Sequence, residues 1–93
     1  MPQSELSPKS TIEAQLVSWL ESNSRGNHKV SLDENYVESG VIDSFDLIVF
    51  IESIEDNYHI KFNNREFQDR RFVIVSGLAE IIDEKVRLQL ERD

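Results

Sequence analysis

The feature that most constrains the fold is the stretch Gly40–Ile51, where a turn leads directly into an apolar run of helical length. Asp43 is a residue type that caps helices, because its carboxylate can accept hydrogen bonds from the amides of the first turn. Asp46 follows three residues later, in a variant of the capping box with Asp in place of Glu. The pattern predicts a helix start that exposes the hydroxyl of Ser44 beside unpaired backbone donors.

A serine in this position can carry a phosphate group, because the first-turn amides and the helix dipole favour an attached anion. The carboxylates of Asp43 and Asp46 oppose that anion, so the dipole permits the modification without requiring it. Asp-Ser before an apolar run is also a common start for helices whose serine carries nothing. The motif alone therefore leaves both interpretations of Ser44 open.

Length and composition indicate one small folded domain. The chain has 93 residues, 39% of them apolar, enough for a single modest core. It has no cysteine, which excludes disulfides and thiolate metal sites. No segment is apolar over a membrane-spanning length, and the N-terminus lacks the features of a signal peptide, so we expect a cytoplasmic protein. We interpret residues 1–9 as a flexible leader and residues 10–93 as one domain.

The net charge of −8 argues against binding to nucleic acid or insertion into an anionic membrane, which favour a basic surface. The acidic residues are concentrated around Ser44, and no Lys or Arg occurs between Ser31 and Ile60. That segment contains eight acids: Asp33, Glu34, Glu38, Asp43, Asp46, Glu52, Glu55 and Asp56. Such a surface is either a solvated face that maintains solubility or a docking surface for basic partners.

Hydrophobic periodicity predicts the first helix over about Thr11–Asn23, with a capping box formed by Ser10 and Glu13. Its expected buried stripe comprises Ile12, Leu16, Trp19 and Leu20. A long connection over residues 28–43 follows, and we expect its apolar residues to hold it against the core: Val30, Leu32, Tyr36, Val37, Val41 and Ile42. His28 is isolated in a polar turn, and we expect it to be exposed and to bind no metal.

The second helix is predicted from Ser44 to about Tyr58. Ile48, Ile51, Ile54 and Tyr58 recur at helical spacing and form the expected buried stripe, with Leu47 and Phe50 contributing beside them. Phe45 and Val49 lie toward a different face. Their side chains either mark a contact with a partner or show that the helix is central and buried on two sides.

The last third of the chain predicts a short extended piece, a brief turn and a long helix. Ile60 and Phe62 of the extended piece should point inward, and His59 before them should be exposed. Asn63 and Asn64 should cap a turn over residues 65–68, and this turn should bring Phe67 to the core. The last helix is expected from about Val73 onward, with a buried stripe of Val75, Leu78, Ile82 and Val86, and with Ile74, Ile81 and Leu88 near it. Gly77 inside this helix allows a close contact.

Three long helices, one short helix and no strand pattern predict an all-α fold, a small four-helix bundle with a long loop between helices 1 and 2. The sequence contains no glycine-rich phosphate loop, no zinc-ligand spacing and no nucleophile with its base. Its carboxylates are dispersed along the chain. We therefore predict that the protein is not an enzyme, and we assign it no catalytic residue and no metal site.

Three segments in this order resemble the acyl carrier protein family. They are Gly40–Asp46, the helix end Glu55–Ile60 with Phe62, and the closing segment Phe72–Ile82; the resemblance covers about residues 11–88. It implies a four-helix carrier domain in which Ser44 receives 4′-phosphopantetheine from a phosphopantetheinyl transferase that uses coenzyme A and magnesium. The arm would hold an acyl or aminoacyl group as a thioester. Implied partners are this transferase, loading ligases or synthases, and acyltransferases.

The chain departs from the family pattern at several positions. Phe45 follows the serine where Leu is most frequent, Val49 stands at a usually acidic position, and Glu52 at a usually apolar one. Arg70 and Arg71 extend the segment before the last helix. These departures favour a freestanding, specialised carrier over a carrier of housekeeping fatty acid biosynthesis. The specialised pathway could be polyketide, nonribosomal peptide, surface-polymer or D-alanyl-transfer biosynthesis, and the sequence does not choose among these.

The expected partner-binding residues lie on the second helix: Phe45, Asp46, Val49, Glu52, Glu55 and Asp56. We expect the carrier to be a monomer. The alternative is an acidic helical adaptor that binds basic partners through the face of Phe45, Val49 and Glu52 and is never modified.

Overall fold

The computed structural model describes residues 8–24 and 29–92. This part of the chain is all-α, as predicted, and contains no strand apart from an isolated bridge between Asn35 and Ile74. Its elements are the helices α1 (Pro8–Asn23), α2 (Ser44–Tyr58), α3 (Asn64–Phe67) and α4 (Val75–Arg92), and the 3₁₀-helix η2 (Arg70–Val73).

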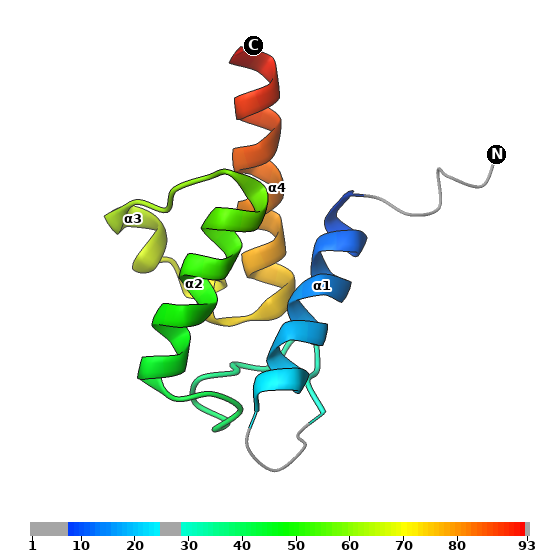
Figure 1. The fold of residues 1–93 in the computed structure, drawn as a ribbon, viewed down its shortest axis with the longest axis vertical. Coiled ribbons are helices and arrows are strands. Elements are labelled where there is room, and N and C mark those ends of the chain that lie inside the picture. Colours follow the sequence, from blue (N-terminus) through cyan, green and yellow to red (C-terminus); the bar gives the residue numbers. More distant parts are fainter. Residues whose placement is uncertain (1–7, 25–28, 93) are drawn as a thin grey trace, which may run out of the picture.

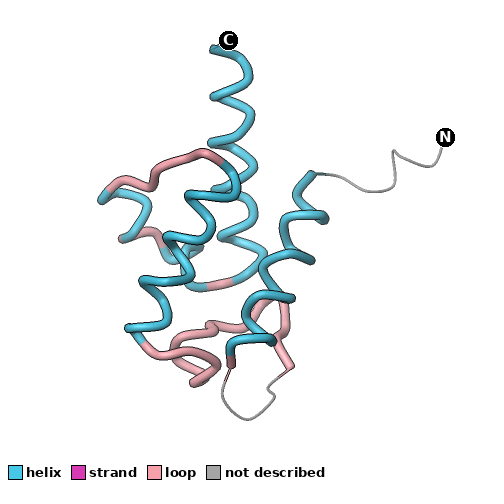
Figure 2. The backbone as a smooth tube through the Cα atoms, in the orientation of Figure 1, coloured by secondary structure: helices cyan, strands magenta, loops and turns pink. Residues whose placement is uncertain are grey.

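The three long helices form the body of the bundle (Figure 1). α1 runs in the opposite direction to α2 and α4, and the last turns of α4 project beyond the rest of the fold. The loop before α2 crosses the end of the bundle at which α2 begins, and α3 lies to one side of α2 and α4 (Figure 2). The beginning of α2 is therefore close to a loop and away from the projecting end of α4.

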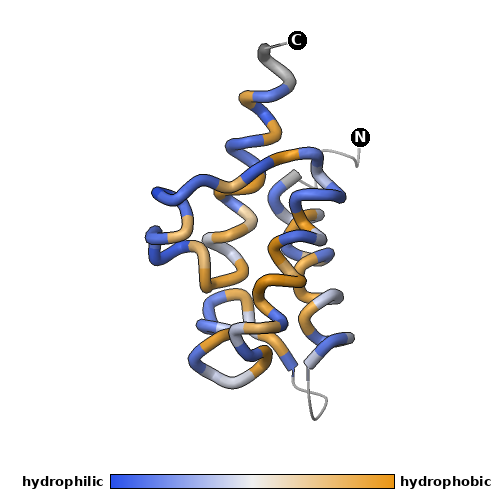
Figure 3. Tube along the Cα trace, turned by 60° about the vertical axis from the view of Figure 1, so that its left-hand side comes forward, coloured by the Kyte–Doolittle hydropathy of each residue, from blue (hydrophilic) through white to orange (hydrophobic). Residues whose placement is uncertain are grey.

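The core contains side chains from α1, α2, α4 and the long loop. Phe50 of α2 is at its centre, with its ring centroid 4.7 Å from that of Trp19 and 5.6 Å from that of Tyr36. Apolar positions recur along the helices (Figure 3). The fully buried side chains with the largest volumes are Tyr36, Phe50, Leu20, Leu78, Ile81, Ile82, Val41 and Val75.

α1 begins earlier than predicted. The helix starts at Pro8, a residue type common at the first helical position because it has no amide hydrogen to leave unpaired. Ser10 therefore lies inside α1, and its predicted role as N-cap is wrong. The predicted stripe is correct for Ile12, Leu16 and Leu20, which are buried, while Trp19 is half-buried. Residues 1–7 of the predicted leader, and His28, lie outside the described residues.

The long loop is docked on the core, as predicted, mainly through Tyr36, Val41 and Ile42, which are buried. The hydroxyl of Tyr36 donates to the carbonyl of Phe72 at 2.5 Å, and its backbone N–H donates to the carbonyl of Val73 at 3.1 Å. These two hydrogen bonds join the loop to η2. The expectation that Leu32 also packs inward is wrong, since its side chain is exposed.

α3 begins with a capping box. The side chain of Asn63 accepts from the N–H of Glu66 at 3.0 Å, and the carboxylate of Glu66 accepts from the N–H of Asn63 at 2.9 Å. Phe67 contacts the rings of Phe62 and Phe72, yet 44% of it is exposed. Phe67 thus covers the edge of the core and is not part of its interior.

α4 begins at Val75, two residues later than predicted, because Arg70–Val73 form η2. The stripe of Val75, Leu78 and Ile82 is fully buried as expected, whereas Leu88 is exposed on the projecting part of the helix.

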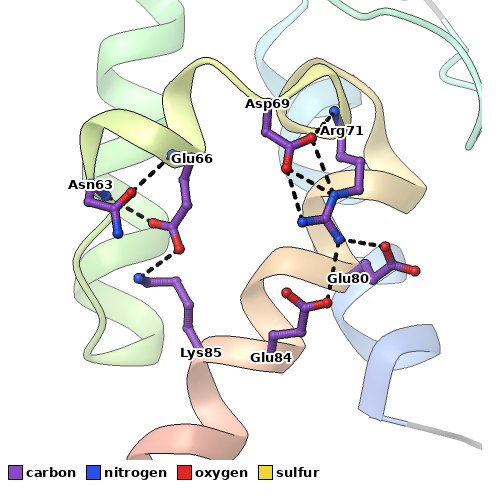
Figure 4. Close-up of polar contacts among 7 residues, drawn as sticks. All are labelled: Asn63, Glu66, Asp69, Arg71, Glu80, Glu84 and Lys85. Atoms are coloured by element: carbon purple, nitrogen blue, oxygen red, sulfur yellow. Dashed lines mark hydrogen bonds and ion pairs between the residues drawn. The ribbon is translucent and has the colours of Figure 1, made fainter.

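Two clusters of ion pairs hold α3 and η2 to α4 (Figure 4). Arg71 of η2 contacts Asp69 at 3.0 Å, Glu80 at 2.6 Å and Glu84 at 3.4 Å. Lys85 of α4 contacts Glu66 of α3 at 3.0 Å. The hydrogen bonds from Arg71 hold the pKa of Asp69 below its ordinary value. The carboxylates around Arg71 are partly exposed, so salt should weaken this cluster, whereas the pair of Lys85 and Glu66 is more buried and should be less sensitive to salt.

Candidate functional site

Ser44 is the first residue of α2 and its side chain is exposed. Asp43 immediately before it is the N-cap, as predicted: its backbone is extended, and its Oδ1 accepts from the N–H of Asp46 at 2.8 Å. The carbonyl of Asp43 accepts from the N–H of Leu47 at 3.0 Å. The bounds of α2 are those predicted from the sequence, and the cap places the Ser44 hydroxyl at the open end of the helix.

The residues before Ser44 anchor this end of the helix. Val41 and Ile42 are buried, and the N–H of Ile42 donates to the carbonyl of Tyr36 at 3.3 Å. Gly40 has a φ of +86°, which L side chains rarely adopt, and its N–H donates to the carbonyl of Val37 at 3.2 Å. The chain thus turns at Gly40, packs two side chains into the core and leaves Ser44 on the surface.

Beyond Ser44, α2 exposes a face that combines apolar and acidic residues. The exposed fractions are 73% for Phe45, 57% for Ile48 and 44% for Val49. Glu52 and Asp56 continue this face at helical spacing and are also exposed. We call these five residues the outer face of α2. Its exposure contradicts the alternative in which α2 is buried on two sides.

Ile48 corrects the predicted stripe of α2. The sequence placed it in the core, but the buried residues are Phe50 and Ile54, with Leu47, Ile51 and Tyr58 packed against the core. Ile48 was therefore missed as a member of the exposed face. Its spacing of three residues from Phe45 was the signal that could have identified it.

Two acidic residues expected to contact partners are only partly exposed. Asp46 lies in the first turn, where a negative charge is favourable to the helix dipole. Glu55 accepts from the N–H of Phe62 at 2.9 Å and lies 4.0 Å from the amino group of Lys61. The carboxylate of Glu55 therefore fixes the loop after α2.

An open groove of about 1050 Å³ runs between the C-terminal half of α2 and the projecting part of α4. One side comprises Val49, Glu52 and Asp56, and the other includes Lys85 and Leu88. His59, at its end, is exposed as predicted; it has a φ of 57° and its N–H donates to the carbonyl of Glu55, ending α2.

The described part of the chain contains no group of three or more His, Asp or Glu side chains placed to hold a metal ion. Among the helices of residues 8–24 and 29–92, none is both long and apolar enough to cross a membrane. The site consists of one exposed hydroxyl at a capped helix end and the neighbouring outer face of α2. Such a hydroxyl is accessible to a modifying enzyme that supplies its own catalytic groups.

Comparisons with models of protein families, with curated proteins and with solved structures find no match to this chain.

Proposed function

We propose that the protein is an acyl carrier protein that bears 4′-phosphopantetheine on Ser44. The observation that carries the proposal is the exposure of Ser44 at the first position of a capped fifteen-residue helix. The sequence resemblance supports it independently of the geometry, because the same serine is the one that the resemblance selects.

The geometry at Ser44 fits a phosphodiester. The amides of the first turn and the positive end of the dipole of α2 favour a negative group on the hydroxyl. The Asp43 carboxylate is bonded to the N–H of Asp46 at 2.8 Å, which partly offsets its repulsion of that group. The capped start of α2 is therefore compatible with a negative group on the Ser44 hydroxyl.

The attachment is a phosphoryl-group transfer from coenzyme A. The Ser44 oxygen forms a bond to the phosphorus next to the pantetheine, and the bond from that phosphorus to the bridging oxygen breaks. Adenosine 3′,5′-bisphosphate leaves, and the hydroxyl proton passes to a base of the phosphopantetheinyl transferase, which also binds the magnesium. When attached, the arm supplies a terminal thiol that holds an acyl or aminoacyl group as a thioester; the carrier itself performs no catalysis.

The outer face of α2 is the proposed contact surface for the transferase and for the loading and transfer enzymes. Phe45, Ile48 and Val49 offer apolar contact beside Ser44, and Glu52 and Asp56 offer negative charge farther along the helix. A partner with a basic patch next to an apolar one would fit this arrangement. Val49 and Glu52 depart from the family pattern on this same face, which supports a specialised biosynthetic pathway.

The test is the intact mass of the purified protein after incubation with coenzyme A, magnesium and the transferase of the source organism. We expect a gain of one phosphopantetheine in the wild type and in Ser39→Ala, a control that removes another exposed serine close in sequence. We expect no gain in Ser44→Ala. An unchanged wild-type mass would overturn the proposal and favour the unmodified adaptor that binds through the same face.

A further inference from the structure

We infer that the open groove between α2 and the projecting part of α4 binds a cationic amphipathic helix of a partner protein. The groove has a volume of about 1050 Å³ and continues from the outer face of α2. Its occupant contacts α4 as well as α2, whereas the sequence placed the partner contacts on α2 alone. The inference goes beyond the proposed function, because it needs no group on Ser44.

Each wall of the groove has an exposed apolar side chain. Val49 of α2 is 44% exposed, and Leu88 of α4 is 60% exposed. Leu88 belongs to the part of α4 that projects beyond the rest of the fold (Figure 1). An apolar stripe that lay between the two walls would remove both side chains from water at once, which favours binding.

The lysines that line the groove are already close to carboxylates. Lys85 of α4 contacts Glu66 of α3 at 3.0 Å (Figure 4), and the amino group of Lys61 lies 4.0 Å from Glu55. A neighbouring carboxylate offsets the positive charge of each lysine. These lysines therefore do not cancel the negative charge of the other lining residues.

That negative charge comes from Glu52 and Asp56 on the α2 wall. Both are exposed and lie one turn apart, and within residues 8–24 and 29–92 neither forms an ion pair. Arg or Lys side chains one turn apart on a partner helix would match this spacing. An uncharged helix would desolvate the two carboxylates without pairing them.

The walls favour a helical occupant over an extended one. Both walls are helices, whose backbone groups are hydrogen-bonded within the helix along most of its length, so an extended peptide would find few backbone partners there. A helix satisfies its own backbone. The α2 wall from Val49 to His59 is about 15 Å long, which accommodates roughly three turns of a partner helix.

A second hollow, of about 840 Å³ between α1 and the end of α2, does not fit the same occupant. The described side chains that line it are all uncharged. Its aromatic residues, Trp19 and Tyr58, are half-buried: the Trp19 ring packs against Phe50, and the Tyr58 hydroxyl donates to Gln15. A cationic amphipathic helix should therefore select the groove between α2 and α4.

The experiment measures the affinity of the full, unmodified protein for two synthetic peptides by titration calorimetry. Both have about 15 residues of Leu, Ala and Arg, long enough to form a helix on binding. One peptide places Leu along one helical face with Arg beside it, and the other spreads the same residues around the helix. We expect the first to bind at least about tenfold more tightly. Neither peptide is aromatic, so Trp19 emission reports on the second hollow and should stay unchanged.

Variants of the apolar wall test the contact with α4. Leu88→Ala should weaken binding of the amphipathic peptide about tenfold, because it removes the apolar side chain of that wall. Leu32→Ala makes the same change at an exposed position of the long loop, outside the groove, and should leave the affinity unchanged.

Charge variants test the acidic wall. The double variant Glu52→Gln with Asp56→Asn should weaken binding about tenfold at low salt and less at high salt. Asp33→Asn with Glu38→Gln removes the same charge from exposed positions of the loop and should have little effect.

Ser44→Ala should bind the amphipathic peptide as the wild type does, which separates this inference from the proposed function. Four results would overturn the inference. They are undetectable binding of the amphipathic peptide at low salt, equal affinity for the two peptides, an unchanged affinity in Leu88→Ala, and a shift of Trp19 emission, which would place the peptide in the second hollow.

Discussion

Gly77 of α4 lies so close to Arg71 of η2 that a Cβ atom at position 77 would stand 2.6 Å from both the Cβ and the carbonyl oxygen of Arg71. The neighbour is backbone as well as side chain, so it cannot simply move aside. The close helix contact that the sequence indicated at this glycine is therefore real, and it fixes the approach of η2 to α4.

Gly77→Ala should destabilise the protein by about 1–3 kcal/mol, the usual cost of overpacking. The sign of this change in the free energy of unfolding is informative, because replacing Gly by Ala at an uncrowded position inside a helix stabilises the protein by up to about 1 kcal/mol. The free energy of unfolding in urea is the measurement. An alanine variant as stable as the wild type, or more stable, would show that η2 is free to shift away from α4.

Arg71→Gln should lower the free energy of unfolding by about 1 kcal/mol at low salt, since its guanidinium contacts three carboxylates, Asp69 at the N-cap of η2 and two on α4. Arg70→Gln removes the same charge from the exposed neighbouring position and should have little effect. In high salt the difference between the two variants should shrink, because the pairs are on the surface. Equal destabilisation by both variants at low salt would indicate a net-charge effect alone.

Tyr36→Phe should cost about 1–3 kcal/mol at neutral pH, because it leaves the buried carbonyl of Phe72 unpaired. Burial raises the pKa of the Tyr36 phenol. The unfolded chain therefore loses this proton at a lower pH than the folded one, so the stabilisation is complete below about pH 10 and is lost as the pH rises above it. The difference in the free energy of unfolding between the wild type and Tyr36→Phe should therefore decrease when urea titrations are run at alkaline pH. Tyr58→Phe is the comparison: the Tyr58 hydroxyl donates to the exposed Gln15 and burial also raises the pKa of this phenol, so the variant should lose less stability at neutral pH and show a weaker change in the same direction.

The sequence was most informative where local chemistry decides the structure. Asp43 and the apolar run after it locate both ends of α2, and Asn63 locates the start of α3 to within one residue, since caps act within a single turn. Ser10 was misleading because Pro8, two residues earlier, is itself a good helix start.

Errors arose where tertiary packing chooses between equivalent local patterns. α2 is apolar at so many positions that two helical stripes fit its sequence, and contact with Trp19 and Tyr36 selects the one through Phe50, leaving Ile48 exposed. η2 is likewise joined to the loop by the hydrogen bonds from Tyr36 to Phe72 and Val73, long-range contacts that no periodicity encodes.

Asp43→Ala should lower the free energy of unfolding by about 1 kcal/mol, because it removes the side chain that accepts from the N–H of Asp46. Asp43→Asn should retain most of the stability, as Asn caps helices equally well. Ser44→Ala should cost little, since Asp43 still caps α2. Urea unfolding of the three variants distinguishes these cases, and a large loss in Ser44→Ala would mean that the serine itself supports the helix.

Glu52→Lys tests whether the outer face of α2 recognises partners. Glu52 is exposed, so its reversal should leave stability unchanged. Under the proposed function it places a positive charge against a basic partner, and kcat/KM of the transferase for the carrier should fall about tenfold, equivalent to about 1.4 kcal/mol. Asp33→Lys makes the same charge change on the exposed part of the loop and should alter kcat/KM far less.

Ionic strength separates a local contact from general attraction. The kcat/KM of the transferase for the wild-type carrier should decrease as salt is added. For Glu52→Lys it should decrease less, because this variant has lost an attractive charge pair with the partner. Equal slowing by both lysine variants would mean that the partner responds only to the net charge of −8. In that case Phe45, Ile48 and Val49 would have to provide the specificity of the outer face, since they are its exposed apolar residues.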